Sequence, residues 1–184
     1  MNYMITKRII GLVVTFAVFV IGSAASPFVR GGQPSDSPTL PSPLCDDVNA
    51  PAGNEAFFHV YARGLQIYRW TGTAWAGTPS ATLYADADYR AQVGTHYAGP
   101  TWESNSGSFV KATRMAGCAP DGTAIPWLKL QATSTSGPGV FSAVTYVQRV
   151  NTTGGLAPTA PGSYINESVE VPYTAEYYFY RGEN

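Results

Sequence analysis

The chain has 184 residues, of which 12% are charged, a formal net charge of −1, and no cluster of lysines and arginines. Nucleic-acid-binding proteins carry basic patches that neutralise phosphates, so this composition excludes nucleic acid as a partner. Aromatic residues make up 13% of the chain, which also holds 19 glycines and 14 prolines, and this favours strands and turns over helices.

Residues 1–25 predict a secretory signal peptide. Lys7 and Arg8 precede an apolar run from Ile9 to Ile21, and small residues follow as far as Ala25. This order is typical of a leader that is cleaved after Ala25. The alternative is an uncleaved membrane anchor, but the run falls short of the roughly 20 residues that span a bilayer. The sequence therefore predicts export to the cell exterior, periplasm or cell wall, with no membrane span after cleavage.

Residues 26–52 are rich in proline, glycine and serine and are predicted to be a linker. Cys45 lies near the end of this stretch, and Cys118 is the only other cysteine. Two cysteines in an exported protein are more often paired than free, so a Cys45–Cys118 disulfide is predicted. They supply too few ligands for structural zinc, and neither a metal site nor a cofactor is predicted.

Residues 53–184 read as a single β domain, because strand patterns alternate with turn signals and no helical period appears. In the longest pattern, Phe57 to Trp70, the apolar face changes phase at Gly64, which predicts either a β-bulge in one strand or two strands joined by a kink there. The run from Phe141 to Val150 is apolar on both faces and predicts a central strand. Further strands are expected at 81–85, 94–97, 101–103, 109–116, 125–133 and 169–179.

Seven or eight strands at intervals of about ten residues are typical of an antiparallel β-sandwich or barrel. We therefore expect an all-β fold with little or no helix outside the signal peptide. The alternating apolar residues of the last strand, Val169 to Phe179, are expected to face its core.

Five motifs, in this order along the chain, resemble one known family. They are Gly64–Tyr68, Gly94–Glu103, Ala124–Leu128, Thr145–Pro158 and Val171–Tyr180. The sequence is similar to the domain of unknown function 3455 family, an uncharacterised group of secreted proteins from bacteria and fungi. The resemblance implies export and an all-β fold, and it brings no established substrate or mechanism.

The motif from Gly94 to Glu103 holds the first candidates for chemistry. His96 is one of only two histidines and could act as a general acid or base. Glu103 would be its carboxylate partner, and Arg149 could hold an anion. The alternative is structural: His96 would brace a tight turn, and Arg149 would form an ion pair with Glu103. A glycosidase-like pair of Glu103 with Glu170 or Glu176 is a further option.

Aromatic side chains suggest a binding surface instead. Tyr97, Trp102 and Trp75 lie beside turn signals, where exposed rings could cover the flat faces of sugars, whereas Trp127 is expected in the core. The alternative is that these aromatic side chains simply fill the interior.

The sequence as a whole favours a secreted, non-enzymatic β-domain that binds a polysaccharide or another cell-envelope component. The first alternative is a secreted hydrolase that uses Glu103 and His96. The second is a structural envelope protein with neither kind of site. The sequence gives no indication of the oligomeric state.

Overall fold

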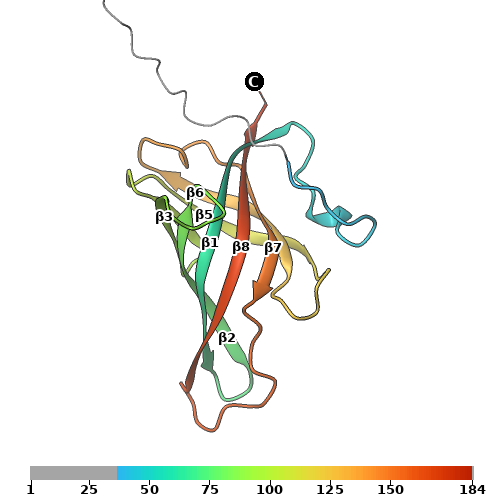
Figure 1. Ribbon diagram of the computed structural model, residues 1–184, viewed down its shortest axis with the longest axis vertical. Coiled ribbons are helices and arrows are strands. Elements are labelled where there is room, and N and C mark those ends of the chain that lie inside the picture. Colours follow the sequence, from blue (N-terminus) through green and yellow to red (C-terminus); the bar gives the residue numbers. More distant parts are fainter. Residues whose placement is uncertain (1–36, 184) are drawn as a thin grey trace, which may run out of the picture. The chain divides into compact units, whose positions relative to one another are not determined.

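The computed structural model describes residues 37–183, and the predicted signal peptide lies outside them (Figure 1). Within these residues the regular structure is all β, apart from one 3-10 turn, η1 (Asp46–Val48). This confirms the predicted fold class. The strands are β1 (Asn54–Trp70), β2 (Trp75–Tyr84), β3 (Gln92–Tyr97), β4 (Thr101–Ser104), β5 (Phe109–Cys118), β6 (Trp127–Ser136), β7 (Tyr146–Gly154) and β8 (Ser168–Gly182).

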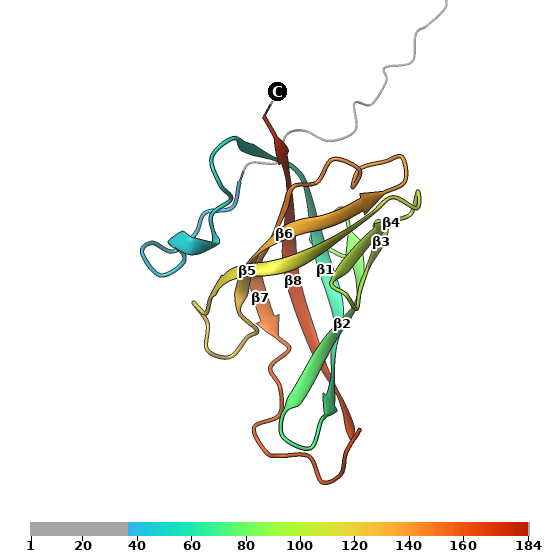
Figure 2. The same ribbon diagram turned by 180° about the vertical axis from the view of Figure 1, so that it is seen from behind.

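The eight strands form one closed barrel. Each strand pairs antiparallel with the next, and β8 pairs with β1 to complete the circle. Of the two architectures that the sequence predicted, the structure therefore adopts the barrel. Closure pairs the strands at what would otherwise be two open edges of the sheet. Figure 2 shows the wall formed by β5 and β6 from behind.

One end of the barrel is plugged by the loop between β6 and β7. Phe141 is 1% exposed and packs against Phe179, with ring centroids 4.7 Å apart. The predicted central strand from Phe141 to Val150 is therefore wrong in its first part, since β7 begins only at Tyr146. The apolar residues Phe141 and Val144 leave the sheet because they fill the end of the barrel.

The predicted bulge or kink at Gly64 is also wrong, since β1 is one continuous strand there. The β1–β2 ladder runs without a shift from Tyr61 to Trp70, so even-numbered residues face inward on both sides of Gly64. A Cβ atom at Gly64 would lie 2.2 Å from the carbonyl oxygen of Ser80, and the glycine thus allows the two strands to approach closely. The apparent change of phase arises because the inner face becomes polar beyond this point, at Gln66 and Tyr68.

The segment before β1 packs against the outside of the barrel, although the sequence predicted a linker there. Cys45 and Val48 are fully buried. A disulfide joins Cys45 to Cys118 at the end of β5, and the Gln148 side chain donates a hydrogen bond of 2.6 Å to the carbonyl oxygen of Val48. The outer face of β7 is therefore covered at this place, which explains why Gln148 is buried without facing the interior.

Candidate functional site

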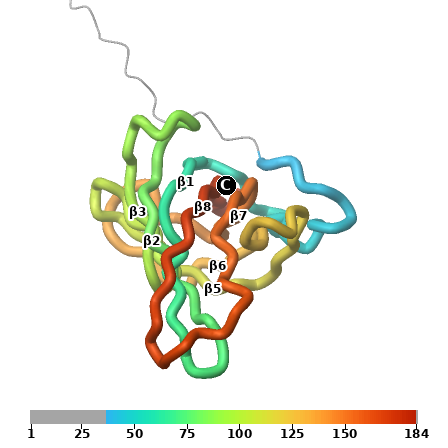
Figure 3. Tube along the Cα trace, turned by 60° about the horizontal axis from the view of Figure 1, so that its bottom comes forward, coloured from blue at the N-terminus to red at the C-terminus, as the bar shows by residue number. Residues whose placement is uncertain are grey.

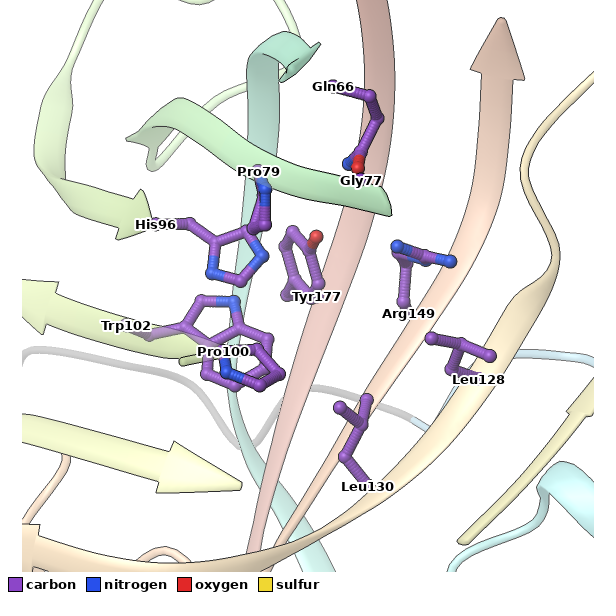
Figure 4. Close-up of a pocket in the computed structure, with 10 residues that line it drawn as sticks. All are labelled: Gln66, Gly77, Pro79, His96, Pro100, Trp102, Leu128, Leu130, Arg149 and Tyr177. Atoms are coloured by element: carbon purple, nitrogen blue, oxygen red, sulfur yellow. The ribbon is translucent and has the colours of Figure 1, made fainter. Parts of the chain in front are cut away.

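A pocket of about 180 Å³ lies inside the barrel, toward the end opposite the Phe141 plug (Figure 4). The β1–β2, β3–β4, β5–β6 and β7–β8 connections all lie at this end, because consecutive strands are antiparallel. In Figure 3 the β1–β2 and β7–β8 connections come forward. The pocket is lined by Gln66, Gly77, Pro79, His96, Pro100, Trp102, Leu128, Leu130, Arg149 and Tyr177.

The β3–β4 hairpin supplies two stacked rings to the pocket. In the turn, Gly99 has a φ of 112°, a left-handed backbone conformation that favours glycine. The hairpin register places His96 opposite Trp102. The rings of these two residues are stacked, with centroids 4.3 Å apart and planes within 10° (Figure 4). Trp102 is 1% and His96 is 3% exposed, so the hairpin presents both side chains to the interior.

The imidazole of His96 is held in its neutral form. Its Nδ1 lies 2.8 Å from the carbonyl oxygen of Thr101. Because a carbonyl oxygen only accepts hydrogen bonds, Nδ1 is the nitrogen that carries the proton. Burial lowers the pKa of His96 to about 3, and the positive charge of Arg149 adds to this effect. At neutral pH the ring is therefore uncharged.

Among residues 37–183, Arg149 on β7 contributes the only charged side chain that lines the pocket at neutral pH. Its Nε and Nη2 donate hydrogen bonds of 3.1 and 2.8 Å to the carbonyl oxygen of Pro126. None of the ion pairs within residues 37–183 involves Arg149. A partly buried cation without an acidic partner is costly. The guanidinium also lies next to the hydroxyl of Tyr177, so the two groups could contact the same ligand.

Several buried polar atoms in and beside the pocket form no well-directed hydrogen bond within residues 37–183. They are Nε2 of Gln66, Nε1 of Trp102 and the hydroxyl groups of Tyr173 and Tyr177. The two hydroxyls lie beside each other, with Gln66 next to Tyr173 and Arg149 next to Tyr177, so these groups have polar neighbours but poor hydrogen-bond geometry. Burial raises the pKa of both tyrosines, so each hydroxyl keeps its proton at neutral pH. Most buried polar groups in proteins are hydrogen-bonded, and four donors without a well-directed hydrogen bond in one region therefore point to a ligand.

The two residues of the predicted acid–base pair lie on opposite faces of the β3–β4 hairpin. Neighbouring residues in a strand point to opposite faces, so Trp102 faces inward and Glu103 outward. Glu103 accepts a hydrogen bond of 2.7 Å from the hydroxyl of Tyr97 on the outer surface. The structure therefore does not bring His96 and Glu103 together. The alternative ion pair of Glu103 with Arg149 is absent for the same reason.

The predicted carboxylate pairs do not form either. Glu103 belongs to β4 and Glu176 to β8, which lie on opposite sides of the closed barrel, and both side chains point outward. Glu176 instead lies 2.8 Å from Nε2 of His59 and accepts a hydrogen bond from Asn151. These contacts lower its pKa, chiefly through the hydrogen bond from His59. Glu170 is exposed on the same strand.

The tryptophans do not form an exposed platform. The expectation that Trp102 is exposed is wrong, because its ring fills the barrel interior. Trp75 is half-buried, and its ring packs against that of Trp70, with ring centroids 5.4 Å apart and an angle of 58° between the ring planes. Its Nε1 donates a hydrogen bond to the carbonyl oxygen of Ala160. Trp127, expected in the core, is half-buried at the start of β6.

Sequence reasoning brought forward His96, Trp102 and Arg149 separately, and the structure places all three at one pocket. It missed Gln66, Tyr173 and Tyr177. Their signal was present in the alternation, since each stands at an inward position where a purely structural core would hold an apolar residue.

Fold and site together define a closed eight-stranded barrel with a partly polar internal pocket. Residues 51–181 match the model of the family described as "Protein of unknown function (DUF3455)", and the chain belongs to this family. No curated protein and no solved structure matches it. Within residues 37–183, no helix has the length and hydropathy required to cross a bilayer, and no cluster of acidic, histidine or cysteine side chains could hold a metal ion.

Proposed function

We propose that this domain is an exported, non-catalytic binding protein that holds a small organic ligand in the pocket at the open end of its barrel. The observation that carries the proposal is a pocket of about 180 Å³ with four buried donors in or beside it that form no well-directed hydrogen bond, among them the indole N–H of Trp102. Interior polar groups without partners cost stability, and a ligand that satisfies them recovers that cost.

Binding without catalysis is favoured by the chemistry of the pocket wall. Of the described residues 37–183, no carboxylate, cysteine or serine lines it. His96 is neutral, with a pKa of about 3, which is far from the value near neutrality that suits a general base. A hydrolase would require a nucleophile or an acid–base pair at this place, and the Glu103 carboxylate points away from it.

Export is supported by the leader-like residues 1–25 and by the Cys45–Cys118 disulfide, since disulfides persist in oxidising compartments. A polysaccharide stays a prediction as the partner. The geometry favours a smaller ligand, because the pocket is enclosed by the barrel wall and Trp102 is not available as a surface platform.

The test fills the pocket and follows binding by NMR. The indole N–H signal of Trp102, assigned with Trp102→Phe, reports on the pocket because this group has no partner within the protein. The probes are small aromatic and branched aliphatic alcohols, amides and acids. We expect saturable shifts of this signal with at least one probe, and we expect Leu128→Trp to abolish them by occupying the pocket.

Ile67→Trp is the matched control, because Ile67 lies on the outer face of β1 between the inward-facing Gln66 and Tyr68. It adds the same ring without filling the pocket, so binding should persist. Shifts that survive in Leu128→Trp, or the absence of shifts with every probe, would refute the proposed pocket.

A further inference from the structure

Resting on the proposed function, we propose that the ligand is a small monocarboxylate with an apolar body, whose carboxylate is bound by Arg149 and Tyr177. The pocket would thus select organic acids over neutral molecules of the same shape.

The pocket carries one positive charge that no acidic side chain of residues 37–183 neutralises. Within the part of the chain that the structure describes, Arg149 is the only cationic side chain that lines the pocket, and no acidic side chain lines it. The hydrogen bonds from Nε and Nη2 to the carbonyl oxygen of Pro126 fix the guanidinium plane but do not neutralise it. The guanidinium lies at the edge of the pocket, beside Leu128 (Figure 4). An anionic group on the ligand would supply the missing counter-charge.

The buried polar groups at the pocket are mainly hydrogen-bond donors. Nε1 of Trp102 and Nε2 of Gln66 can only donate, and the hydroxyls of Tyr173 and Tyr177 keep their protons at neutral pH. A ligand that satisfies the two N–H groups must bring acceptors, and the tyrosine hydroxyls can donate to the same acceptors. A carboxylate brings two oxygens and four lone-pair directions and carries no donor, whereas an ammonium group brings only donors.

The single cation in the pocket matches a ligand with one negative charge rather than two. A phosphate ester carries nearly two negative charges at neutral pH and is typically held by several cationic groups. This pocket offers one permanent cation, because His96 is neutral. A single negative charge on a planar carboxylate matches the planar fork of one arginine.

The walls of the pocket are apolar and suit a ligand with an apolar body. Leu128, Leu130, Pro79, Pro100 and the ring of Trp102 form apolar walls around the pocket (Figure 4). A cavity of roughly 150 Å³ takes a benzene ring, so about 180 Å³ suits a body of one ring or a short branched chain. Benzoate, which joins one ring to one carboxylate, is therefore a suitable probe.

The test compares benzoate with benzamide and benzyl alcohol, which keep the ring and lose the charge, and with phenyl phosphate. Affinity is measured by titration calorimetry and by the Trp102 indole signal in the wild-type protein. We expect benzoate to bind roughly tenfold or more tightly than each of the other three compounds. Neutral analogues or phenyl phosphate that bind equally well or better would overturn the inference and leave the pocket itself established as a binding site.

Variants assign the contact. Arg149→Gln should weaken benzoate binding by roughly 10- to 100-fold and leave benzyl alcohol unchanged. Arg69→Gln is the matched control, because Arg69 is exposed on the outside of β1. Arg149→Lys keeps the charge without the planar fork and should give an intermediate loss. Equal effects of Arg149→Gln on benzoate and benzyl alcohol would overturn the assignment, and binding of none of the four compounds would overturn the proposed function as well.

Discussion

Replacing Tyr177 by phenylalanine separates a binding role from a structural one. Tyr177 is 1% exposed, and its ring packs against Trp102 and His96 with centroid distances of 5.3 and 5.1 Å. Phenylalanine preserves this packing and removes only the hydroxyl, which lies beside Arg149 and the hydroxyl of Tyr173 but forms no well-directed hydrogen bond with either. A buried unpartnered polar group costs about 1–3 kcal/mol. We therefore expect Tyr177→Phe to raise the free energy of unfolding of the ligand-free protein by about 1 kcal/mol.

Tyr68 provides the matched control on the same inner face of the barrel. Its hydroxyl is buried and donates a hydrogen bond of 2.6 Å to the carbonyl oxygen of Gly155. Tyr68→Phe removes the same atom but leaves that carbonyl without its partner. We expect it to lower the free energy of unfolding by about 1–2 kcal/mol. Identical chemical changes should thus have effects of opposite sign.

Urea unfolding of the mature protein, followed by tryptophan fluorescence, measures both differences. The slope of the transition should be unchanged in both variants, because neither alters the surface that unfolding exposes. The same two proteins are then titrated with benzoate, where Tyr177→Phe should bind more weakly than the wild type. A loss of more than about 1 kcal/mol in Tyr177→Phe would show that its hydroxyl is a structural donor and would refute the reasoning.

Two further predictions concern stability. Cys45→Ser combined with Cys118→Ser should lower the free energy of unfolding by about 4 kcal/mol in the chain-entropy model, given the sequence separation of 73; urea unfolding measures this, and probe binding should survive because the disulfide lies outside the barrel. His96 has a pKa of about 3 in the folded protein and about 6.5 in the unfolded chain. As the pH falls from about 6.5 toward 3, the unfolded chain therefore binds a proton that the folded protein does not. The free energy of unfolding should decrease over this range, with a slope of up to about 1.4 kcal/mol per pH unit. Unfolding measured between pH 7 and pH 5 should show this slope in the wild type and a flatter one in His96→Gln, and equal slopes would contradict the buried neutral histidine.

Much of the fold follows from alternation and turn chemistry. Inward-facing Tyr173, Ala175, Tyr177 and Phe179 stand where the last strand was expected to face the core. The sequence could not decide between a sandwich and a barrel, because that choice depends on whether β8 returns to β1. It also misplaced Phe141, since an apolar plug at a barrel end and a buried strand have the same composition.

The site was harder to predict because it depends on which face each residue occupies. His96 and Glu103 are close in the sequence, but the hairpin register places Trp102 opposite His96 and turns Glu103 outward. The wrong prediction of a bulge or kink at Gly64 has the same cause. Apolar residues at Leu65 and Ile67 suggested that the inner face had moved, whereas the inner face continued through the polar Gln66.

The inner face of one continuous sheet thus serves two purposes along its length. Toward the Phe141 plug it is apolar and packed, with Val60, Leu83 and Phe179 fully buried. Toward the other end it carries Arg149 and buried donors that form no well-directed hydrogen bond, and such groups cost stability until a ligand satisfies them. A barrel that served only as a scaffold would be more stable with apolar side chains at those positions. A ligand that brings a negative charge and acceptors recovers this cost on binding, and the degree of stabilisation rises with its concentration relative to its dissociation constant.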